Sequence, residues 1–284
     1  MKIGIESTAY FGYYNFEEGM KQLRSHGYDG FDYQGVCNIG QSPIYKMTEG
    51  EAERYLTEVK ECAAANELEI HQLHGVWPHV DDTTQAGREK TIEYLQQNLL
   101  QAKFLGCPYV VIHPCMFKGW GQGTLEEMFD VNVALLRKLL PYAEKYGVTV
   151  CMENMPFAKG TTFSTAAELK AVVQELNSPF IKICLDTGHL NVSKGDMYEA
   201  ICLFGDDLAA LHVHDDMYGQ DRHLIPFQGE VDWNGLVRGL KDISYKGFMS
   251  LETKIQLSTP QPMLDEMRIS LAKIARHLAD AVEK

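Results

Sequence analysis

Short apolar segments alternate along the chain with longer amphipathic ones, and this alternation constrains the fold more than any other feature. Strands are predicted over Lys2–Glu6, Gly30–Gln34, Leu68–His74, Tyr109–His113, Val148–Glu153, Ile181–Asp186, Ala209–His212 and Gly247–Glu252. Between them apolar residues recur at helical spacing, most clearly in Glu51–Ala65, Arg88–Leu105 and Val131–Tyr146. Strands that alternate with helices build a parallel sheet with right-handed crossovers. Eight such units in roughly 250 residues are the size of a closed (β/α)8 barrel.

The chain is predicted to form one domain. An α/β barrel routinely reaches 284 residues as a single domain, and no linker or low-complexity tract divides the sequence. A doubly wound open sheet is the alternative, but neither G-x-G-x-x-G nor G-x-x-x-x-G-K-[ST] follows the first predicted strand. We therefore predict an α/β protein, a (β/α)8 TIM barrel over residues 1–284. The longest irregular stretch is expected at Val213–Val231, and loops of that length usually carry function.

Six successive predicted strands end on an ionisable side chain. These are His74, His113, Glu153, Asp186, His212 and Glu252. Because the active sites of barrels lie at the C-terminal ends of the strands, we expect these groups to meet at one rim. Alternate residues of a strand share a face, so Cys151 and Cys184 should lie inside the barrel below the carboxylates. His71 should face the surrounding helices.

This set of side chains suits a divalent metal ion. Carboxylates mixed with imidazoles are ligands for Zn, Mn, Fe or Co, and Mg is an option where oxygen ligands dominate. Two glutamates, one aspartate and one histidine can hold one ion and leave positions open for substrate oxygens. Without a cation, the converging carboxylates would repel one another in a partly buried cleft.

Other histidines and aromatic residues are weaker indications of function. A single histidine outside the six strand ends is expected to be structural, and this applies to His26, His71, His79 and His277. Aromatic side chains that could wall a sugar, or equally pack under loops, are Phe11, Tyr13, Tyr14, Trp77, Trp120 and Phe157.

Composition excludes several classes of protein. The chain carries 26 basic and 39 acidic residues, a net charge of −13. A surface that binds nucleic acid by phosphate attraction is usually basic, and an acidic chain does not dock on an anionic membrane. No run of 18 apolar residues predicts a transmembrane helix, and no signal peptide is recognised at the start. Seven cysteines without a C-x-x-C pair indicate reduced thiols and a cytoplasmic location.

The motifs together resemble a known superfamily. Glu153, then Asp186-Thr187-Gly188-His189, then His212, then Glu252 resemble the xylose isomerase-like TIM-barrel superfamily over the whole chain. Its members include sugar and sugar-phosphate isomerases and epimerases, inositol-pathway isomerases and dehydratases, and the apurinic-site endonuclease IV enzymes. The stretches Asp221–Leu224 and Gln228–Trp233 are similar to the D-x-H … G-x-G-x-(I/V)-D-W segment of many sugar isomerase-like members.

The resemblance implies a role for each residue that matches. The implied metal ligands are Glu153, Asp186, His212 and Glu252. Glu153 and Glu252 would also be the catalytic residues. The implied substrate-binding residues are His74, His113, His189, Arg222 and His223. The epimerases that act on free ketoses usually carry an arginine six residues after the metal histidine. Tyr218 stands there in this sequence, and Arg222 is the candidate replacement.

The same resemblance also allows a nuclease function. The residues that match the further ligands of the trinuclear zinc site in endonuclease IV are His74, His113, His189, Asp221 and His223. The charge of −13 weighs against DNA as the substrate.

The predicted function is a divalent-metal-dependent isomerase or epimerase of a sugar, a sugar phosphate or an inosose. One ion (Mn, Zn, Co or Mg) would bind two adjacent substrate oxygens, and proton transfer between Glu153 and Glu252 would pass through an enediolate. The predicted binding partner is a small sugar. Binding to nucleic acid or to a membrane is not expected, and assembly into a homo-oligomer is left open. The alternatives are an endonuclease IV-like enzyme with a multinuclear zinc site, a metal-dependent dehydratase on the same site, and a non-catalytic sugar-binding barrel.

Overall fold

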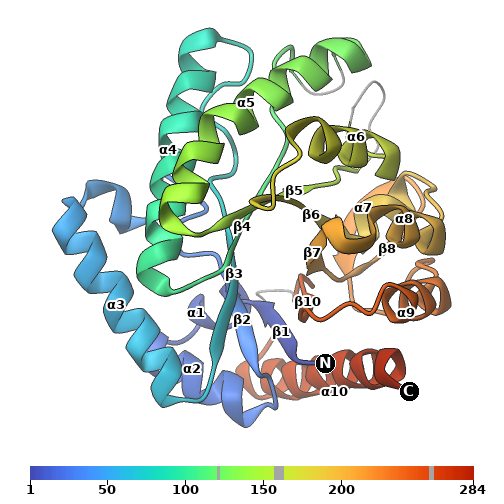
Figure 1. Ribbon diagram of the computed structural model, residues 1–284. Helices are drawn as coiled ribbons and strands as arrows, with labels where there is room; N and C mark the ends of the chain where they lie inside the picture. Colours follow the sequence, from blue (N-terminus) through green and yellow to red (C-terminus); the bar gives the residue numbers. More distant parts are fainter. Residues whose placement is uncertain (120–121, 157–162, 256–258) are drawn as a thin grey trace.

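The structure, a computed structural model, describes residues 1–119, 122–156, 163–255 and 259–284. In this part of the chain, helices surround a ring of parallel strands (Figure 1). The strands of the ring are β1 (Ile3–Glu6), β2 (Gly30–Tyr33), β3 (Glu69–His74), β4 (Tyr109–Ile112), β5 (Thr149–Glu153), β6 (Ile181–Asp186), β7 (Leu208–His212) and β10 (Met249–Leu251). The α-helices are α1 (Thr8–Phe11), α2 (Phe16–Ser25), α3 (Glu49–Ala65), α4 (Gln85–Leu105), α5 (Leu125–Tyr146), α6 (Ala166–Leu176), α7 (Thr187–Val192), α8 (Met197–Phe204), α9 (Trp233–Asp242) and α10 (Gln261–Glu283), with 3-10 turns η1 (Pro43–Lys46) and η2 (Gly205–Asp207).

The ring of strands confirms the predicted TIM barrel. The eight strands pair in the order β10-β1-β2-β3-β4-β5-β6-β7, and every pair in this series is parallel. The circle closes through a parallel bridge between Val213 and Leu251, where Val213 N donates to Ser250 O at 2.8 Å. Closure leaves no sheet edge exposed and brings all eight carboxyl ends of the strands to one rim.

Local sequence signals determine where the helices begin and end. Thr48, Thr124 and Thr165 each form a capping box with the glutamate three residues later, which satisfies two free backbone groups at each helix start. Helices α4 and α5 end at Gly106 and Gly147, which adopt left-handed φ angles of 69° and 67°.

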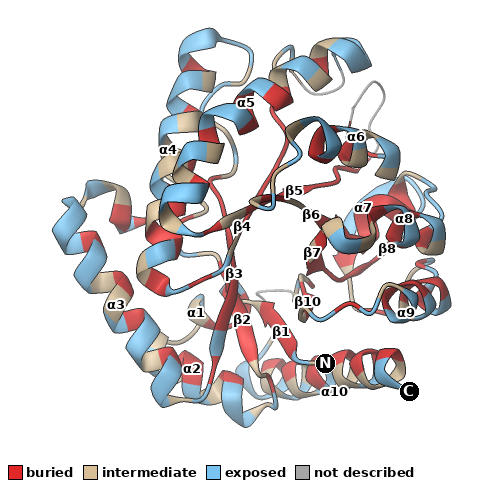
Figure 2. Cartoon of the chain, in the orientation of Figure 1, coloured by how far each residue is buried: buried red, intermediate tan, exposed pale blue. Residues whose placement is uncertain are grey.

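The barrel interior is filled in layers, as the alternation of side chains predicted. Val111, Cys151, Cys184 and Ala210 form a buried cluster of their own, apart from the larger core between strands and helices. Figure 2 shows the strands of the ring mostly buried, with exposed residues on the outer faces of the helices. The small side chains of the interior cluster leave room above them for the longer polar groups at the rim.

The prediction that His71 faces the surrounding helices is wrong. The pairing of β2 with β3 shifts register between Phe31 and Asp32, so β3 carries an irregularity beside His71. A Cβ built on Gly4 of β1 would lie 2.3 Å from the His71 ring, and His71 Nε2 lies 2.8 Å from Ser250 Oγ on β10. Its ring therefore lies in the lower part of the barrel interior. Burial lowers the pKa of His71 to about 3, so it is neutral there.

The prediction of an irregular stretch at Val213–Val231 is also wrong in part. Strands β8 (Asp215–Met217) and β9 (Gln220–Leu224) form an antiparallel hairpin within it. The tight turn at Gly219, whose φ is 72°, joins the two strands. The hairpin turns the chain back toward the rim, so residues beyond β7 can reach the end of the barrel.

No helix in the described ranges is both long and apolar enough to cross a membrane.

Candidate active site

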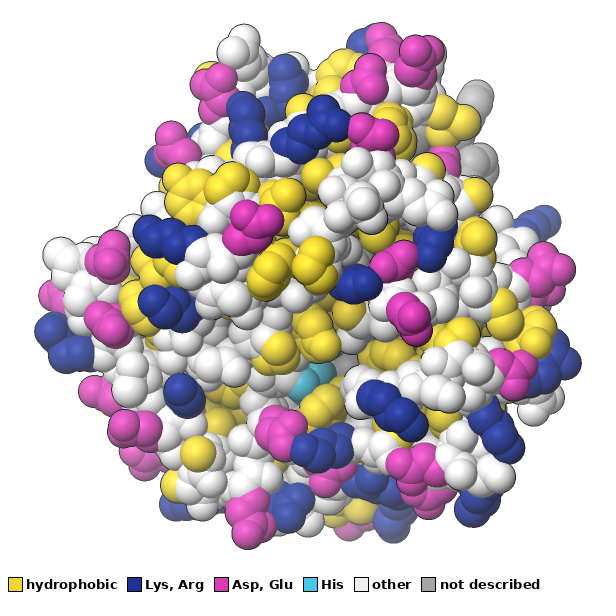
Figure 3. Space-filling view, in the orientation of Figure 1, with side chains coloured by type: hydrophobic (Ala, Val, Ile, Leu, Met, Phe, Trp, Pro, Cys, Tyr) yellow, Lys and Arg dark blue, Asp and Glu magenta, His cyan; other side chains and the backbone are white. Residues whose placement is uncertain are grey.

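Every strand of the barrel contributes an ionisable group at or just beyond its carboxyl end. In chain order these are Glu6, Asp32, His74, His113, Glu153, Asp186, His212 and Glu252. Six of them are buried, and the other two, Glu6 and Glu252, are partly buried, with 18% of the Glu252 side chain accessible. The structure thus brings together the four groups that were predicted as metal ligands. Figure 3 shows histidine near the centre of one face of the molecule, at a hollow.

Glu153 is the centre of this arrangement. Its Oε2 atom lies 3.1 Å from His212 Nδ1, 3.2 Å from His113 Nε2 and 3.8 Å from His74 Nε2. Its Oε1 atom lies 3.5 Å from His189 Nδ1. Four imidazoles around one carboxylate, itself 1% exposed, make a compact set of candidate ligand atoms.

The ligand atoms of Glu153, Asp186, His212 and Glu252 all lie within 4.8 Å of one another. Glu153 Oε2 and His212 Nδ1 are buried and make no hydrogen bond among the described residues, although they face each other. Unsatisfied polar atoms in a protein interior are rare and costly. A divalent cation between them would satisfy both, so these residues fit a bound metal ion.

Asp32 orients His212 for this role, and the sequence reasoning missed it. Asp32 Oδ2 accepts a hydrogen bond from His212 Nε2 at 3.1 Å, which assigns the ring proton to Nε2 and leaves Nδ1 as the free acceptor. A carboxylate behind a metal-binding histidine fixes its tautomer and orientation. Parity along the predicted strand Gly30–Gln34 was the available signal, because it places Asp32 on the inner face.

His214 is a second residue that the sequence reasoning did not assign. Its Nε2 lies 2.8 Å from Asp186 Oδ2, and its Nδ1 lies 3.3 Å from Asp216 Oδ2. All three side chains are fully buried. His214 stands two residues after His212, and this period-2 spacing could have pointed to it. Thr187 Oγ1 donates to the His214 carbonyl at 2.7 Å and ties this segment to the end of β6.

A second cluster lies beside the first and contains His189, Asp221 and His223. Asp221 Oδ1 lies 3.7 Å from His189 Nε2 and 3.2 Å from His223 Nε2. The His223 ring stacks on the His214 ring at 4.0 Å between centroids. The β8–β9 hairpin is what carries Asp221 and His223 back to the rim.

Backbone carbonyls orient three of these histidines in the same way. His74 Nδ1 pairs with Gly75 O at 2.8 Å, His189 Nδ1 with Asn154 O at 2.9 Å, and His223 Nδ1 with Glu252 O at 2.9 Å. Each Nδ1 then carries the donated proton, which fixes the orientation of the ring. The Nε2 atom donates where it faces a carboxylate, as His223 Nε2 faces Asp221, and it would lose that proton to bind a metal ion.

The charges of the cluster shift the pKa values of its members. Burial lowers the pKa of His113 to about 4. Burial also lowers the pKa of His74, but Cys37 and Glu153 outweigh it and raise that pKa to about 10. Burial raises the pKa of Glu153, yet His212 and His113 outweigh it and hold it well below the usual range. In the metal-free protein, protons on the histidines therefore balance the buried carboxylates.

The structure does not bring every predicted residue to the cluster. Arg222 is exposed on β9, and the alternation of side chains directs it to the face opposite Asp221 and His223. Its place in substrate binding stays a prediction. Tyr218 is 51% exposed.

The aromatic residues that were predicted as possible walls of a sugar site lie in different places. Trp77 packs against His113 at 4.3 Å between ring centroids and therefore lies beside the site. Phe11 and Tyr13 line a cavity next to the rim, whereas Tyr14 Oη donates to Asp265 on α10. Trp120 and Phe157 lie outside the described residues. The histidines expected to be structural include His79, whose Nδ1 pairs with Asp82 at 2.9 Å.

Comparison with known proteins identifies the family. The family described as "Xylose isomerase-like TIM barrel" matches residues 4–274. The chain belongs to this family. Within the xylose isomerase-like barrels, an uncharacterized protein of Methanocaldococcus jannaschii is 24% identical over 89% of this chain and 84% of its own length. A D-psicose 3-epimerase of Enterocloster bolteae is 34% identical over 41% of this chain and 37% of its own. A "Probable endonuclease 4" of Metamycoplasma arthritidis is 25% identical over 78% of this chain and 82% of its own.

Solved structures of the family share the fold. A D-tagatose 3-epimerase-like protein superimposes with a TM-score of 0.79 at 23% identity, over 100% of this chain and 98% of the other. The IOLI protein, whose crystal structure binds a zinc atom, superimposes with a TM-score of 0.76 at 20% identity, over 99% of this chain and 98% of the other. The family match confirms the predicted superfamily, and the solved structures share the barrel fold.

Proposed function

We propose that the protein is a divalent-metal-dependent sugar isomerase or epimerase. The observation that carries this proposal is the convergence of Glu153, Asp186, His212 and Glu252, whose ligand atoms lie within 4.8 Å of one another at the catalytic end of the barrel. Relatives named as D-psicose and L-ribulose 3-epimerases support the reaction class.

The four residues would hold one ion of Mn, Zn, Co or Mg. When bound, such an ion polarises a substrate carbonyl and makes the adjacent C–H more acidic. Asp32 keeps the proton of His212 on Nε2, and His214 fixes one oxygen of Asp186 through its 2.8 Å contact. Asp32 and His214 therefore fix the orientation of His212 and Asp186 before a substrate binds.

Glu153 and Glu252 would move the substrate proton. Both carboxylates approach the same nitrogen, since His212 Nδ1 lies 3.1 Å from Glu153 Oε2 and 3.3 Å from Glu252 Oε2. One carboxylate takes the proton from the carbon beside the carbonyl, and the other returns a proton to the opposite face. This transfer inverts the carbon, which is an epimerisation.

The surrounding histidines would bind hydroxyl groups of the sugar. His74, His189 and His223 present Nε2 atoms on rings that backbone carbonyls fix through Nδ1, and His113 contacts both Glu153 and Trp77. Imidazole acceptors and donors at fixed positions distinguish the hydroxyl orientations of related sugars.

Exchange of carbon-bound hydrogen with deuterated water tests the proposal. The metal-loaded protein is given ketoses, ketose phosphates and inosose-type ketones, and deuterium in the sugar is followed by NMR. Glu252→Gln should reduce exchange at least 100-fold while substrate binding weakens much less, because proton transfer matters in the transition state. Glu53→Gln, an exposed change on α3, is the matched control and should exchange like the wild type. Absence of exchange with every sugar and every one of the four metals would contradict the proposal.

A second candidate function is an abasic-site DNA endonuclease of the endonuclease IV type. The observation that favours it is the pair of further ligand sets, His74–His113–Glu153 and His189–Asp221–His223, beside the first site. The net charge of −13 weighs against it. On the face drawn in Figure 3, basic and acidic side chains are intermixed among the described residues rather than separated into a basic stripe.

Metal stoichiometry and DNA cleavage separate the two functions. We expect one tightly held ion per chain by elemental analysis, no cleavage of an abasic duplex, and little DNA binding even at low salt. Three stoichiometric ions together with cleavage would reverse the order of the two candidates.

A further inference from the structure

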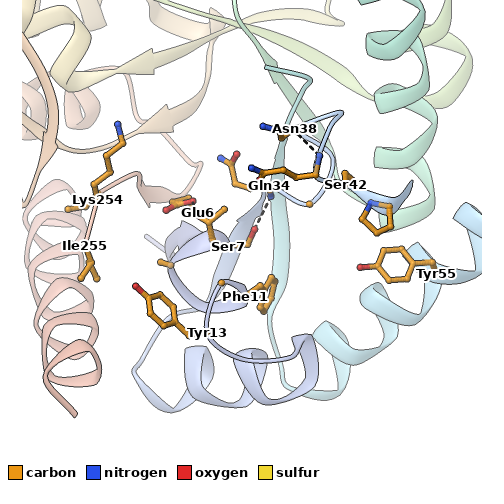
Figure 4. A pocket seen from close by; sticks show the side chains of 17 residues that line it. Glu6, Ser7, Phe11, Tyr13, Gln34, Asn38, Ser42, Tyr55, Lys254 and Ile255 are labelled. Atoms are coloured by element: carbon orange, nitrogen blue, oxygen red, sulfur yellow. Dashed lines mark hydrogen bonds between the residues drawn. The ribbon is translucent and has the colours of Figure 1, made fainter. Parts of the chain in front are cut away.

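A cavity of about 760 Å³ opens beside the four-ligand site, between the segments that follow β1, β2 and β10. We call it the β1–β10 cavity (Figure 4). Its walls are residues 6–9 and 11–13, residues 34, 35, 38 and 41–43, residues 253–255, and Tyr55 of α3. The volume lies within the range of small-molecule sites, which is roughly 300–1,000 Å³.

The cavity adjoins the catalytic rim but is not part of the four-ligand site. Glu6, which ends β1, and Thr253, which follows Glu252 directly, stand in its wall. None of the four predicted metal ligands is among its described lining residues. The cavity therefore begins next to the strand ends that carry Glu6 and Glu252.

The lining of the cavity combines aromatic rings with polar side chains. Figure 4 shows the rings of Phe11 and Tyr13 in the lower part of the view and the amides of Gln34 and Asn38 above them. A sugar ring has apolar C–H faces and a periphery of hydroxyl groups, and it needs both kinds of partner. Lys254 is the only basic residue among the described lining residues, and it is exposed, which fits a neutral sugar better than a phosphate.

Three hydroxyl groups in the cavity wall lack a partner. Tyr13 Oη, Ser42 Oγ and Thr253 Oγ1 are buried and make no hydrogen bond within the described part of the chain. Ser42 is 8% exposed and Thr253 is 1% exposed. Buried polar atoms are nearly always hydrogen-bonded, so these three hydroxyls keep a free donor beside the cavity, which rotation of each O–H or side chain would offer to the hydroxyl groups of a ligand.

We propose that the β1–β10 cavity is a subsite for a second sugar ring. The substrate class is then a ketose that carries a linked ring, such as a ketodisaccharide, rather than a free ketose. This inference rests on the proposed isomerase or epimerase function. The reacting ketose lies at the four ligands, and the linked ring lies between the aromatic walls and the unpartnered hydroxyls.

The inference is tested with fructose and with two disaccharides in which glucose is linked to O4 or O6 of fructose. Deuterium exchange by the metal-loaded enzyme should have a kcat/KM at least tenfold higher for a linked sugar than for free fructose. Gln41→Trp, at an exposed position in the cavity wall, should fill the subsite and lower kcat/KM for the linked sugar at least tenfold more than for fructose. Gln174→Trp, an exposed change on α6, is the matched control and should alter neither value.

A second variant separates binding from folding. Tyr13→Phe removes an unpartnered hydroxyl and keeps the ring, so its Tm should not fall. Its kcat/KM for the linked sugar should fall about fivefold more than that for fructose, which is the effect of about one lost hydrogen bond.

The outcomes distinguish the two proposals. Equal or better exchange with free fructose, or an equal effect of Gln41→Trp on both sugars, would overturn the subsite and leave the isomerase function standing. No exchange with any sugar would overturn the proposed function, and the subsite with it.

Discussion

Gly188 offers a direct test of how the metal site is supported. It is the second residue of α7, directly after the end of β6 that carries Asp186. A Cβ at this position would lie 2.0 Å from His214 Cε1 and 2.7 Å from Asp216 Oδ2, and both side chains are fully buried. To relieve this overlap, the His214 ring must move by roughly 1 Å or more, because non-bonded carbon atoms settle near 3.5–4 Å. The 2.8 Å contact of His214 with Asp186 is then lost, since a separation near 3.6 Å or more is no hydrogen bond.

The expected magnitude of Gly188→Ala follows from that lost contact. Loss of the partner behind a metal ligand lowers metal affinity by about 10- to 100-fold, which is about 1.4–2.7 kcal/mol. Overpacking of a buried site costs a further ~1–3 kcal/mol of unfolding free energy. Titration of the metal-free protein with Zn or Mn against a chelating indicator gives the affinity. Thermal unfolding with and without EDTA gives the stability.

Gly50→Ala is the matched control. Gly50 lies in the first turn of α3, and a Cβ there would meet nothing within 4 Å. The same chemical change should therefore leave metal affinity unaltered and raise stability by up to about 1 kcal/mol through helix propensity. Metal affinity of Gly188→Ala within twofold of the wild type would refute the view that His214 supports Asp186.

The remaining predictions concern the metal and the barrel interior. Asp186→Ala should purify without stoichiometric metal and lose the stabilisation by added ion, which for the wild type is about 2.7 kcal/mol at a metal concentration of 100 Kd; a fully metal-loaded variant by elemental analysis would count against the ligand assignment. His71 is neutral in the fold, with its pKa lowered by burial to about 3, so the unfolded chain takes up the proton first as pH falls below about 6.5. The contribution of His71 to the free energy of unfolding is thus retained above pH 6.5 and lost as pH falls toward 3. At pH 5, about 1.5 pH units below the unfolded pKa, the loss is about 2 kcal/mol, since each unit corresponds to about 1.36 kcal/mol. Urea unfolding at pH 7 and pH 5 should show this loss in the wild type and a smaller one in His71→Asn.

Much of the site could be predicted because, in a barrel, the end of each strand in the sequence has a known place at one rim. Each of Glu153, Asp186 and His212 ends a strand, and parallel strands in a barrel bring their ends to one rim whatever their separation along the chain. Strand parity was equally reliable for Cys151 and Cys184, because β5 and β6 keep a regular alternation at those positions.

His71 could not be placed from the sequence, for a physical reason. Parity assumes an unbroken strand, and the irregularity in β3 reverses the faces for the residues on one side of it. Nothing in the local sequence identifies that irregularity, because it depends on Gly4 and Gly30 of the adjoining strands. A Cβ on Gly4 would overlap the His71 ring, and a Cβ on Gly30 would lie 2.3 Å from Glu69 O. The space that admits His71 is therefore made by other strands.

The position of the second cluster, His189, Asp221 and His223, depends on Asp215, a buried acid of the β8–β9 hairpin that is not itself a candidate metal ligand. Asp215 Oδ1 accepts from Val231 N at 3.1 Å, and its Oδ2 accepts from Trp233 Nε1 at 3.2 Å, which fixes the end of the segment. A Cβ on Gly229 would lie 2.4 Å from Asp215 Oδ1, so the chain can pass only where this residue has no side chain. Gly229 thus acts through close packing on Asp215. Because the returning chain is held there, His223 is fixed opposite Glu252, where its Nδ1 reaches the Glu252 carbonyl. The position of the second cluster therefore depends on the packing of residues 215–233 as well as on the contacts of Asp221 with His189 and His223.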